Sequence, residues 1–127
     1  MVNGGVNGGV NGRVNGGVNM RMSAPRVTVL MAVHDTPAAL LDQAIHSIRS
    51  QTFDALEFLI LDDGSRQEPT RAALREHAAA DPRIRMLWEP HRGLTSTLNR
   101  GLAAARGEWI ARQDADDWSD RDRLQRQ

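Results

Sequence analysis

The stretch VTVLMAV (residues 27–33) decides the fold class, because it is a nearly continuous run of apolar, strand-forming residues. Such a run is typical of a strand that is buried on both faces of a parallel sheet. Thr36 and Pro37 follow it and supply an N-cap and a first-turn signal for a helix. The sequence therefore predicts a strand and then a helix, the first unit of an α/β chain.

The rest of the chain repeats this alternation of strand and helix. Further strands are expected at residues 56–61, 84–88 and 108–113. Helices are expected at about residues 37–51, 68–81 and 94–106. The apolar stripe of the last helix is expected at Leu94, Leu98, Leu102 and Ala105. Such alternation predicts a mostly parallel sheet flanked by helices, with strand order 3-2-1-4 and a ligand crevice between the first and fourth strands.

Composition excludes several classes of function. Lys+Arg and Asp+Glu balance at 16 each, so no net charge favours nucleic acid or an anionic membrane. The chain contains no Cys and no Lys, which excludes thiolate chemistry, a P-loop and a Schiff base. Its apolar stretches are far shorter than a membrane span and no cleavable signal pattern opens it, so a soluble, cytoplasmic domain without a transmembrane segment is expected.

The amino-terminal segment differs in kind from the rest. Residues 2–19 repeat Val-Asn-Gly-Gly almost without variation. This repeat has one small apolar side chain per unit, so burial cannot offset the entropy of ordering it. We expect a disordered tail over residues 1–22 and one domain over residues 23–127. A β-rich assembly of the repeat is the less favoured alternative, because Gly weakens strands.

Acidic residues follow three of the predicted strands, as Asp35, Asp62 with Asp63, and the run from Asp114 to Asp117. They would line one edge of the sheet, where uncompensated carboxylates repel unless a cation or hydrogen-bond donors hold them. Carboxylates two residues apart at a strand end point to the same side, so Asp114 and Asp116 would share a hard divalent cation that also holds a diphosphate. The alternative is a set of solvated turns.

Five segments resemble the amino-terminal half of a family 2 glycosyltransferase, in the order and spacing of that family. They are residues 27–35, 51–53, 61–65, 93–101 and 107–117. The resemblance covers residues 25–127 and implies a Rossmann-like GT-A half that binds a nucleotide-diphosphate sugar with Mn²⁺ or Mg²⁺. It implies sugar transfer to an acceptor that the sequence does not identify.

The resemblance also implies roles for residues near the nucleotide base. Ala32 and His34 would lie at the base, where the family usually has Tyr in place of His34. An imidazole still offers a flat face for stacking. Asp63 would accept a hydrogen bond from a base nitrogen, while Asp62 would brace the turn. For His34 the alternative is a capping or solvent-facing turn residue.

Further roles fall on the diphosphate and the metal. Arg92 precedes the last predicted helix, where it would meet phosphate or base, and an ordinary surface arginine is the alternative. Asp114 and Ala115 would approach the ribose. Asp116 would ligate the metal, with Asp114 as the second acid of the metal site.

The chain also departs from the family pattern. Arg121 stands where the family often has Pro after its acidic motif. The chain ends at Gln127 within an expected helix, so the acceptor-binding half and the catalytic base are expected beyond it. A non-catalytic nucleotide-binding or scaffold fragment of the same fold is the alternative function. A response-regulator receiver is disfavoured by the missing Lys, and a dinucleotide-binding oxidoreductase by the lack of Gly in residues 32–37.

Overall fold

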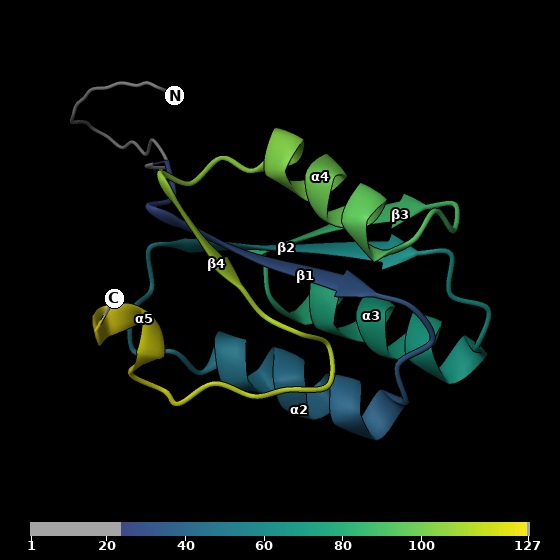
Figure 1. The fold of residues 1–127 in the computed structure, drawn as a ribbon. Helices are drawn as coiled ribbons and strands as arrows, with labels where there is room; N and C mark the ends of the chain where they lie inside the picture. Colours follow the sequence, from purple (N-terminus) through teal and green to yellow (C-terminus); the bar gives the residue numbers. More distant parts are fainter. Residues whose placement is uncertain (1–23, 127) are drawn as a thin grey trace.

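The structure is a computed structural model that describes residues 24–126. A four-stranded parallel sheet runs in the order β3-β2-β1-β4 (Figure 1), which confirms the predicted topology. The strands are β1 (Val27–Val33), β2 (Leu56–Asp63), β3 (Ile84–Glu89) and β4 (Trp109–Arg112). The helices are α2 (Ala38–Arg49), α3 (Glu68–Ala80), α4 (Leu94–Ala104) and α5 (Arg123–Arg126). The predicted disordered tail lies outside the described residues.

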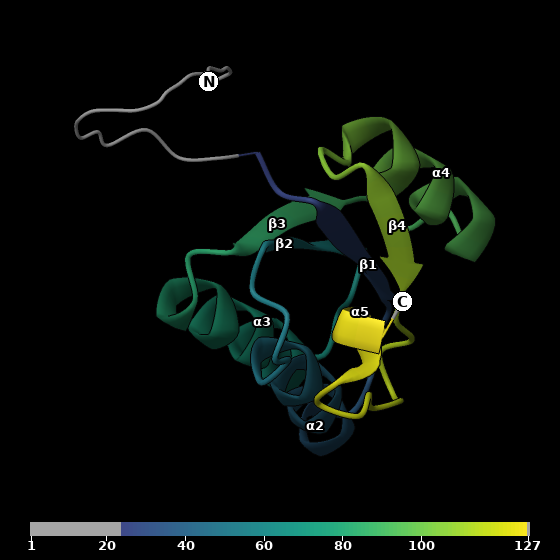
Figure 2. The same ribbon diagram turned by 90° about the vertical axis from the view of Figure 1, so that its left-hand side faces the viewer.

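Helices cover both faces of the sheet, with α2 and α3 on one face and α4 on the other (Figures 1 and 2). The larger core cluster contains Val29 and Met31 of β1 together with Ile45 of α2. A smaller cluster on the opposite face joins Leu30 to Leu59 and Leu61 of β2 beneath α4. The central strand is therefore buried on both faces, as its apolar run predicts. In residues 24–126, no helix has the length and apolar character needed to cross a membrane.

Two local predictions are wrong. Helix α2 begins at Ala38 with Pro37 as its N-cap, and no side chain caps it. The Thr36 carbonyl instead accepts the hydroxyl hydrogen of Thr70 at 2.7 Å, which ties the start of α2 to α3. On α4 the buried positions are Thr97 and Gly101, while Leu94 and Leu102 are about half exposed. The cause of the second error is the close approach of α4 to the sheet, described next.

Helix α4 packs on the sheet through small residues. A Cβ atom at Gly101 would overlap the side chains of Leu30 and Leu61, so a larger residue would force these buried leucines to shift. The helix therefore turns Thr97 and Gly101 toward β1 and β2, with Leu98 partly buried beside them. Leu94 and Leu102 lie outside this face and are left at the surface. This packing fixes the start of α4 over the carboxyl end of the sheet.

The chain after β4 is clamped along α2. The Gln51 side chain donates to the Asp120 carbonyl at 2.6 Å and accepts from the Leu124 backbone N–H at 3.0 Å. The Thr52 N–H donates to the Arg121 carbonyl at 2.7 Å. Leu124 is buried in the larger core cluster. The Gln51–Thr52 step thus fixes the course of the segment that follows the acidic run.

Candidate functional site

The carboxyl ends of the strands meet at one edge of the sheet, and three predicted site residues gather there. His34 follows β1, Asp63 ends β2, and Arg92 lies in the loop between β3 and α4. Because β2 lies between β1 and β3, the loops after β1 and β3 flank Asp63 from both sides. The parallel order therefore brings together residues that are far apart in the sequence.

Asp63 is the best-anchored acid of this edge. Its residue is 3% exposed, and its Oδ1 accepts the Arg92 N–H at 2.7 Å. Its Oδ2 accepts the Gly93 N–H at 3.1 Å and lies 3.1 Å from His91 Nδ1. Desolvation raises the pKa of Asp63, but the Arg92 N–H, the Thr97 hydroxyl, the Gly93 N–H and the nearby His91 together outweigh it and hold the pKa below its ordinary value. We call Asp63 with residues 91–93 the Asp63 cradle.

The turn after β2 has its own bracing. Asp62 Oδ2 accepts the Ser65 N–H at 2.9 Å, so the predicted bracing role of Asp62 is confirmed. The Ser65 hydroxyl accepts the Asp35 N–H at 2.8 Å, which links the loop after β1 to this turn. Asp35 Oδ1 accepts the N–H groups of Arg66 and Gln67 at 2.7 and 2.9 Å. The Gln67 N–H is the main cause of a lowered Asp35 pKa.

Gly64 permits the loop of the Asp63 cradle to lie against this turn. Its φ is +68°, a conformation that side chains disfavour. A Cβ atom at Gly64 would lie 2.6 Å from the His91 nitrogen and 2.9 Å from the His91 Cα. The two loops therefore pack backbone to backbone, which places the N–H groups of residues 92 and 93 on Asp63.

The ring of His34 stacks on that of His91, which belongs to the Asp63 cradle. The rings of His34 and His91 are 4.2 Å apart between centroids, at an interplanar angle of 21°. His34 Nδ1 donates to the Asp63 carbonyl at 2.7 Å, and His91 Nδ1 lies 3.2 Å from the same oxygen. The sequence did not identify His91, and the signal available was only its place after β3. His34 is exposed, as the turn interpretation expects, yet it is also oriented by Asp63.

Arg92 and Ala32, the other predicted residues near the Asp63 cradle, make fewer side-chain contacts. The Arg92 side chain is exposed, and the structure anchors the residue through its backbone N–H. Ala32 is partly buried in β1 and is paired with Leu61. Alternation along β1 places Ala32 on the same face as Leu30, which is the face that α4 covers. Ala32 thus lies on that face near the strand end, and His34 directly follows β1.

The acidic run after β4 has a different construction. Strand β4 ends at Arg112, and the Asp117 N–H donates to the Asp114 carbonyl at 3.2 Å to close a turn. Strand alternation therefore does not set the directions of Asp114 and Asp116, and a metal shared by the two carboxylates stays a prediction. Asp114, Asp116 and Asp117 are exposed, whereas Ala115 is buried in the larger core cluster. We call residues 114–117 the acidic turn.

Few contacts hold the carboxylates of the acidic turn. Asp114 Oδ1 lies 3.4 Å from the Arg112 guanidinium, and Asp117 Oδ1 accepts the Trp118 N–H at 2.8 Å. The Asp116 carboxylate has no hydrogen-bonding or ion-pairing partner among residues 24–126. Carboxylate oxygens are the hard donors that Mg²⁺ and Mn²⁺ prefer. The exposed donor set therefore suits a hard divalent cation by its chemistry.

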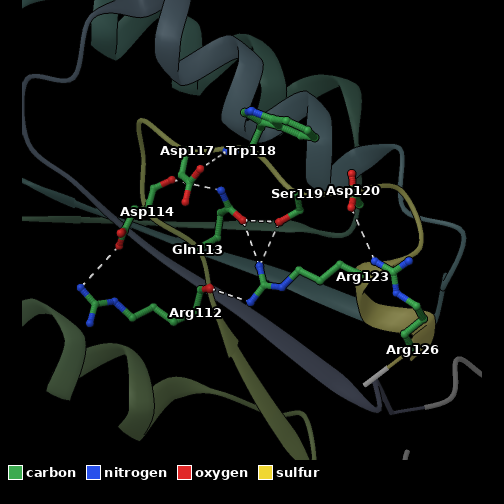
Figure 3. Close-up of a pocket in the computed structure, with 9 residues that line it drawn as sticks. All are labelled: Arg112, Gln113, Asp114, Asp117, Trp118, Ser119, Asp120, Arg123 and Arg126. Atoms are coloured by element: carbon green, nitrogen blue, oxygen red, sulfur yellow. Dashed lines mark hydrogen bonds and ion pairs between the residues drawn. The ribbon is translucent and has the colours of Figure 1, made fainter.

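A hollow of about 450 Å³ lies beside the acidic turn (Figure 3). Its lining residues come from residues 112–126 and include Asp114 and Asp117 together with Arg112, Arg123 and Arg126. Gln113 Oε1 accepts the Ser119 hydroxyl hydrogen at 2.6 Å and an Arg123 N–H at 3.0 Å, which stiffens the wall. The hollow does not reach the Asp63 cradle. The site thus consists of two parts, because β1 lies between the strand end that carries Asp63 and the acidic turn after β4.

Comparison with known proteins identifies the family. A family model described as "Glycosyl transferase family 2" matches residues 28–127. The chain belongs to this glycosyltransferase family. Among curated relatives, the "Putative glycosyltransferase EpsH" of Bacillus subtilis is 38% identical over 101 residues, which is 80% of this chain and 29% of that protein. The "Putative glycosyltransferase EpsE" of the same organism is 35% identical over 106 residues, which is 83% of this chain and 38% of that protein.

Solved structures of similar fold agree with this family assignment. The mannosyltransferase PcManGT from Pyrobaculum calidifontis, in complex with GDP-Man and Mn²⁺, matches with a TM-score of 0.70 and 31% identity. The match covers 80% of this chain and 31% of that one. S. aureus TarS residues 1–349, in complex with UDP-GlcNAc, has a TM-score of 0.70 at 19% identity, covers 80% of this chain and 29% of that one, and supports the fold alone. The chain spans about a third of the length of these glycosyltransferases.

Proposed function

We propose that this family 2 glycosyltransferase domain binds a nucleotide-diphosphate sugar through a divalent metal, for transfer of the sugar to an acceptor. The observation that carries the proposal is the Asp63 cradle, a buried carboxylate that backbone N–H groups hold in place at the carboxyl edge of the sheet. The similarity to PcManGT, a protein in complex with GDP-Man and Mn²⁺, supports the choice of ligand. Neither nucleic acid nor a membrane is a partner in this proposal.

The base would bind over the Asp63 cradle. Each carboxylate oxygen has about two lone pairs, and Asp63 Oδ1 uses one of them for the Arg92 N–H. The second is free to accept an N–H group from the base. His34 would offer its ring face to the base, and Ala32 would leave room beneath it. The exposed Arg92 side chain would meet a phosphate.

The acidic turn would serve the rest of the donor. Asp116 would ligate Mn²⁺ or Mg²⁺, Asp114 would be the second metal-site acid, and Asp114 with Ala115 would approach the ribose. The buried Ala115 side chain supports this by anchoring the turn to the core. A bound metal would neutralise charge on the departing diphosphate. The carboxylates of the acidic turn would hold the cation at the same edge of the sheet as the base site.

We also propose that residues 23–127 form the donor-binding domain and residues 1–22 a tail outside it. The catalytic base and the acceptor site would belong to the part of the relatives that this chain does not span. A positioned base contributes about 10²–10⁴-fold to such a transfer, so this chain alone would bind donor weakly and transfer it poorly. The cytoplasmic location expected from the sequence stays a prediction.

A thermal-shift panel of nucleotide-diphosphate sugars, with and without Mn²⁺, tests the proposal. At least one donor should raise the melting temperature, and Asp116→Asn should abolish the Mn²⁺-dependent part of that rise. The matched control is Asp54→Asn, since Asp54 is an exposed acid that precedes β2 at the opposite edge of the sheet. Nucleotide binding by Asp116→Asn as tight as that of the parent in Mn²⁺ would contradict the metal assignment. Binding without transfer to any acceptor would favour the scaffold alternative.

A further inference from the structure

Strand β4 forms one edge of the sheet, and β1 is its only neighbouring strand within residues 24–126 (Figure 2). The N–H groups of Trp109 and Gln113 donate to carbonyls in and just before β1, each at 3.0 Å. Backbone polar groups alternate in direction along a strand, so those of Ile110 and Arg112 point away from β1. This outer edge therefore offers a row of N–H and carbonyl groups on which another strand can pair.

Large apolar side chains are exposed along the same edge. Trp109 is 66% exposed and Ile110 is 43% exposed. Trp109 shares one face of β4 with Ala111, which belongs to the larger core cluster. Ala111 and Leu124, both of that cluster, line a hollow of about 720 Å³ together with Trp109. A strand edge that exposes apolar side chains in this way is a surface suited to a partner strand.

The charges of this edge are complementary to themselves. Glu108 and Arg112 lie two residues before and two residues after Ile110, and both are exposed. Antiparallel pairing with a second copy, centred on Ile110, places Glu108 opposite the partner's Arg112 and Arg112 opposite the partner's Glu108. It also places Ile110 opposite the partner's Ile110. Parallel pairing in the same register would set like charges against each other, so the edge favours an antiparallel copy of itself.

The backbone fits the same register. Residues 108, 110 and 112 all point outward, and in this pairing each lies opposite an outward-pointing residue of the partner, with which it exchanges hydrogen bonds. The Arg112 carbonyl already accepts an N–H of Arg123 at 2.9 Å, and its second lone pair is left for the partner. The Arg112 side chain lies 3.4 Å from Asp114, but a pair of exposed side chains is worth little and leaves Arg112 free to turn.

We propose that a second copy of this chain docks on β4 through an antiparallel strand pair, with a two-fold axis at Ile110. The sheets of the two copies then form one continuous sheet. On the face of the larger core cluster, Trp109 lies opposite the partner's Ala111, so each indole covers the hollow of the other copy and anchors the contact. A two-fold contact closes on itself and gives a dimer. The proposal goes beyond the donor-binding function and does not rest on it.

Sedimentation velocity of the full 127-residue chain, without nucleotide or metal, tests the dimer from about 1 μM to about 1 mM, the range expected of so short an edge. The parent should pass from monomer to dimer as its concentration rises. Glu108→Arg makes both charge pairs like-charged and should weaken the dimer at least about 10-fold. Adding Arg112→Glu to Glu108→Arg restores opposite charges and should bring the dissociation constant back to within about 3-fold of the parent.

The matched control is Glu76→Arg, the same charge change at an exposed position of α3, which should leave the dimer unchanged. A parent that stays monomeric over the whole range would overturn the proposal. So would an equal weakening by Glu76→Arg, or a loss in Glu108→Arg that the added Arg112→Glu does not restore. Circular dichroism of each variant confirms that the fold persists. Asp116→Asn separates this proposal from the donor-binding one, because it should dimerise like the parent and lose only Mn²⁺-dependent nucleotide binding.

A crosslink tests the position of the two-fold axis independently. The chain has no Cys, so Ile110→Cys gives one thiol per copy. Opposed residues of a hydrogen-bonded antiparallel pair have Cα atoms about 5.5 Å apart, which is within reach of a disulfide. Mild oxidation should convert Ile110→Cys to a covalent dimer and leave Glu76→Cys largely monomeric. Equal crosslinking at the two positions would show that β4 is not the contact.

Discussion

The Asp63 cradle and the acidic turn place carboxylates at the same edge of one sheet by opposite means. Asp63 is 3% exposed and receives backbone N–H groups on both of its oxygens. Asp114, Asp116 and Asp117 are exposed, and the turn is anchored through the buried methyl group of Ala115 instead. In the first region the protein holds the carboxylate itself, and in the second it holds only the backbone.

The difference follows from the cost of burying charge. A buried carboxylate is tolerated only when donors compensate it, and the first N–H groups near the start of α4 do so for Asp63. Exposed carboxylates need no such donors, because water screens their repulsion. A cation that displaces this water from exposed carboxylates breaks no hydrogen bonds within the protein. A fixed acid therefore suits recognition of one N–H group, and a solvated set suits a cation.

The largest expected effect is that of Asp63→Ala. The substitution removes the acceptor of the Arg92 and Gly93 N–H groups and of the His91 ring. Unsatisfied donors cost about 1–3 kcal/mol each, and water reaches some of them, so we expect the free energy of unfolding to fall by about 2–4 kcal/mol. Urea denaturation of parent and variant measures this. A loss below about 0.5 kcal/mol, the range of ordinary surface substitutions, would show that the cradle is not held as described.

Much of the fold was predictable, because periodicity reports which faces are buried. The run 27–33 is buried except at Val27 and Ala32, which are partly buried, and Leu41, Ala44, Ile45 and Ile48 all lie in the core, as their spacing indicates. The same reasoning placed Leu98 and Ala105 correctly against the core but was wrong for Leu94 and Leu102. Counting apolar side chains favours Leu94 and Leu102, whereas the helix approaches the sheet through Gly101, whose value lies in having no side chain. How closely a helix approaches a sheet depends on the side chains of both elements, so the pattern of the helix alone does not reveal it.

The site divides in the same way. The strand order put the ends of β1, β2 and β4 at one edge, which follows from alternation alone. The role of His91 was not predictable, because it depends on the contact between its backbone and Gly64. The directions of Asp114 and Asp116 were not predictable, because both residues follow β4 in a turn to which strand alternation does not apply. Partners of a loop residue depend on tertiary contacts that periodicity does not encode.

Acid should weaken the cradle selectively. Because the folded-state pKa of Asp63 is lowered, its ionised form stabilises the fold at pH values above the unfolded-state pKa near 3.8. This contribution is lost as the pH falls below that value and through the folded pKa. The stability difference between parent and Asp63→Asn should therefore be full at pH 6 and shrink below about pH 4. Urea denaturation over that range measures it, and a difference that stays constant with pH would contradict the assignment.

The smallest expected effect is that of Asp116→Asn on stability. The Asp116 carboxylate is exposed and has no partner among residues 24–126, so its charge contributes little to the folded state. Removing it also relieves repulsion from Asp114 and Asp117, which offsets any weak favourable interaction. We expect the free energy of unfolding without metal to change by no more than about 0.5 kcal/mol. Urea denaturation beside Asp63→Asn, the same chemical change in the cradle, makes the comparison direct. Equal losses of unfolding free energy in the two variants would mean that the fold depends on the acidic turn as much as on the Asp63 cradle. The carboxylates of the acidic turn would then have a structural role instead of being free to bind a cation.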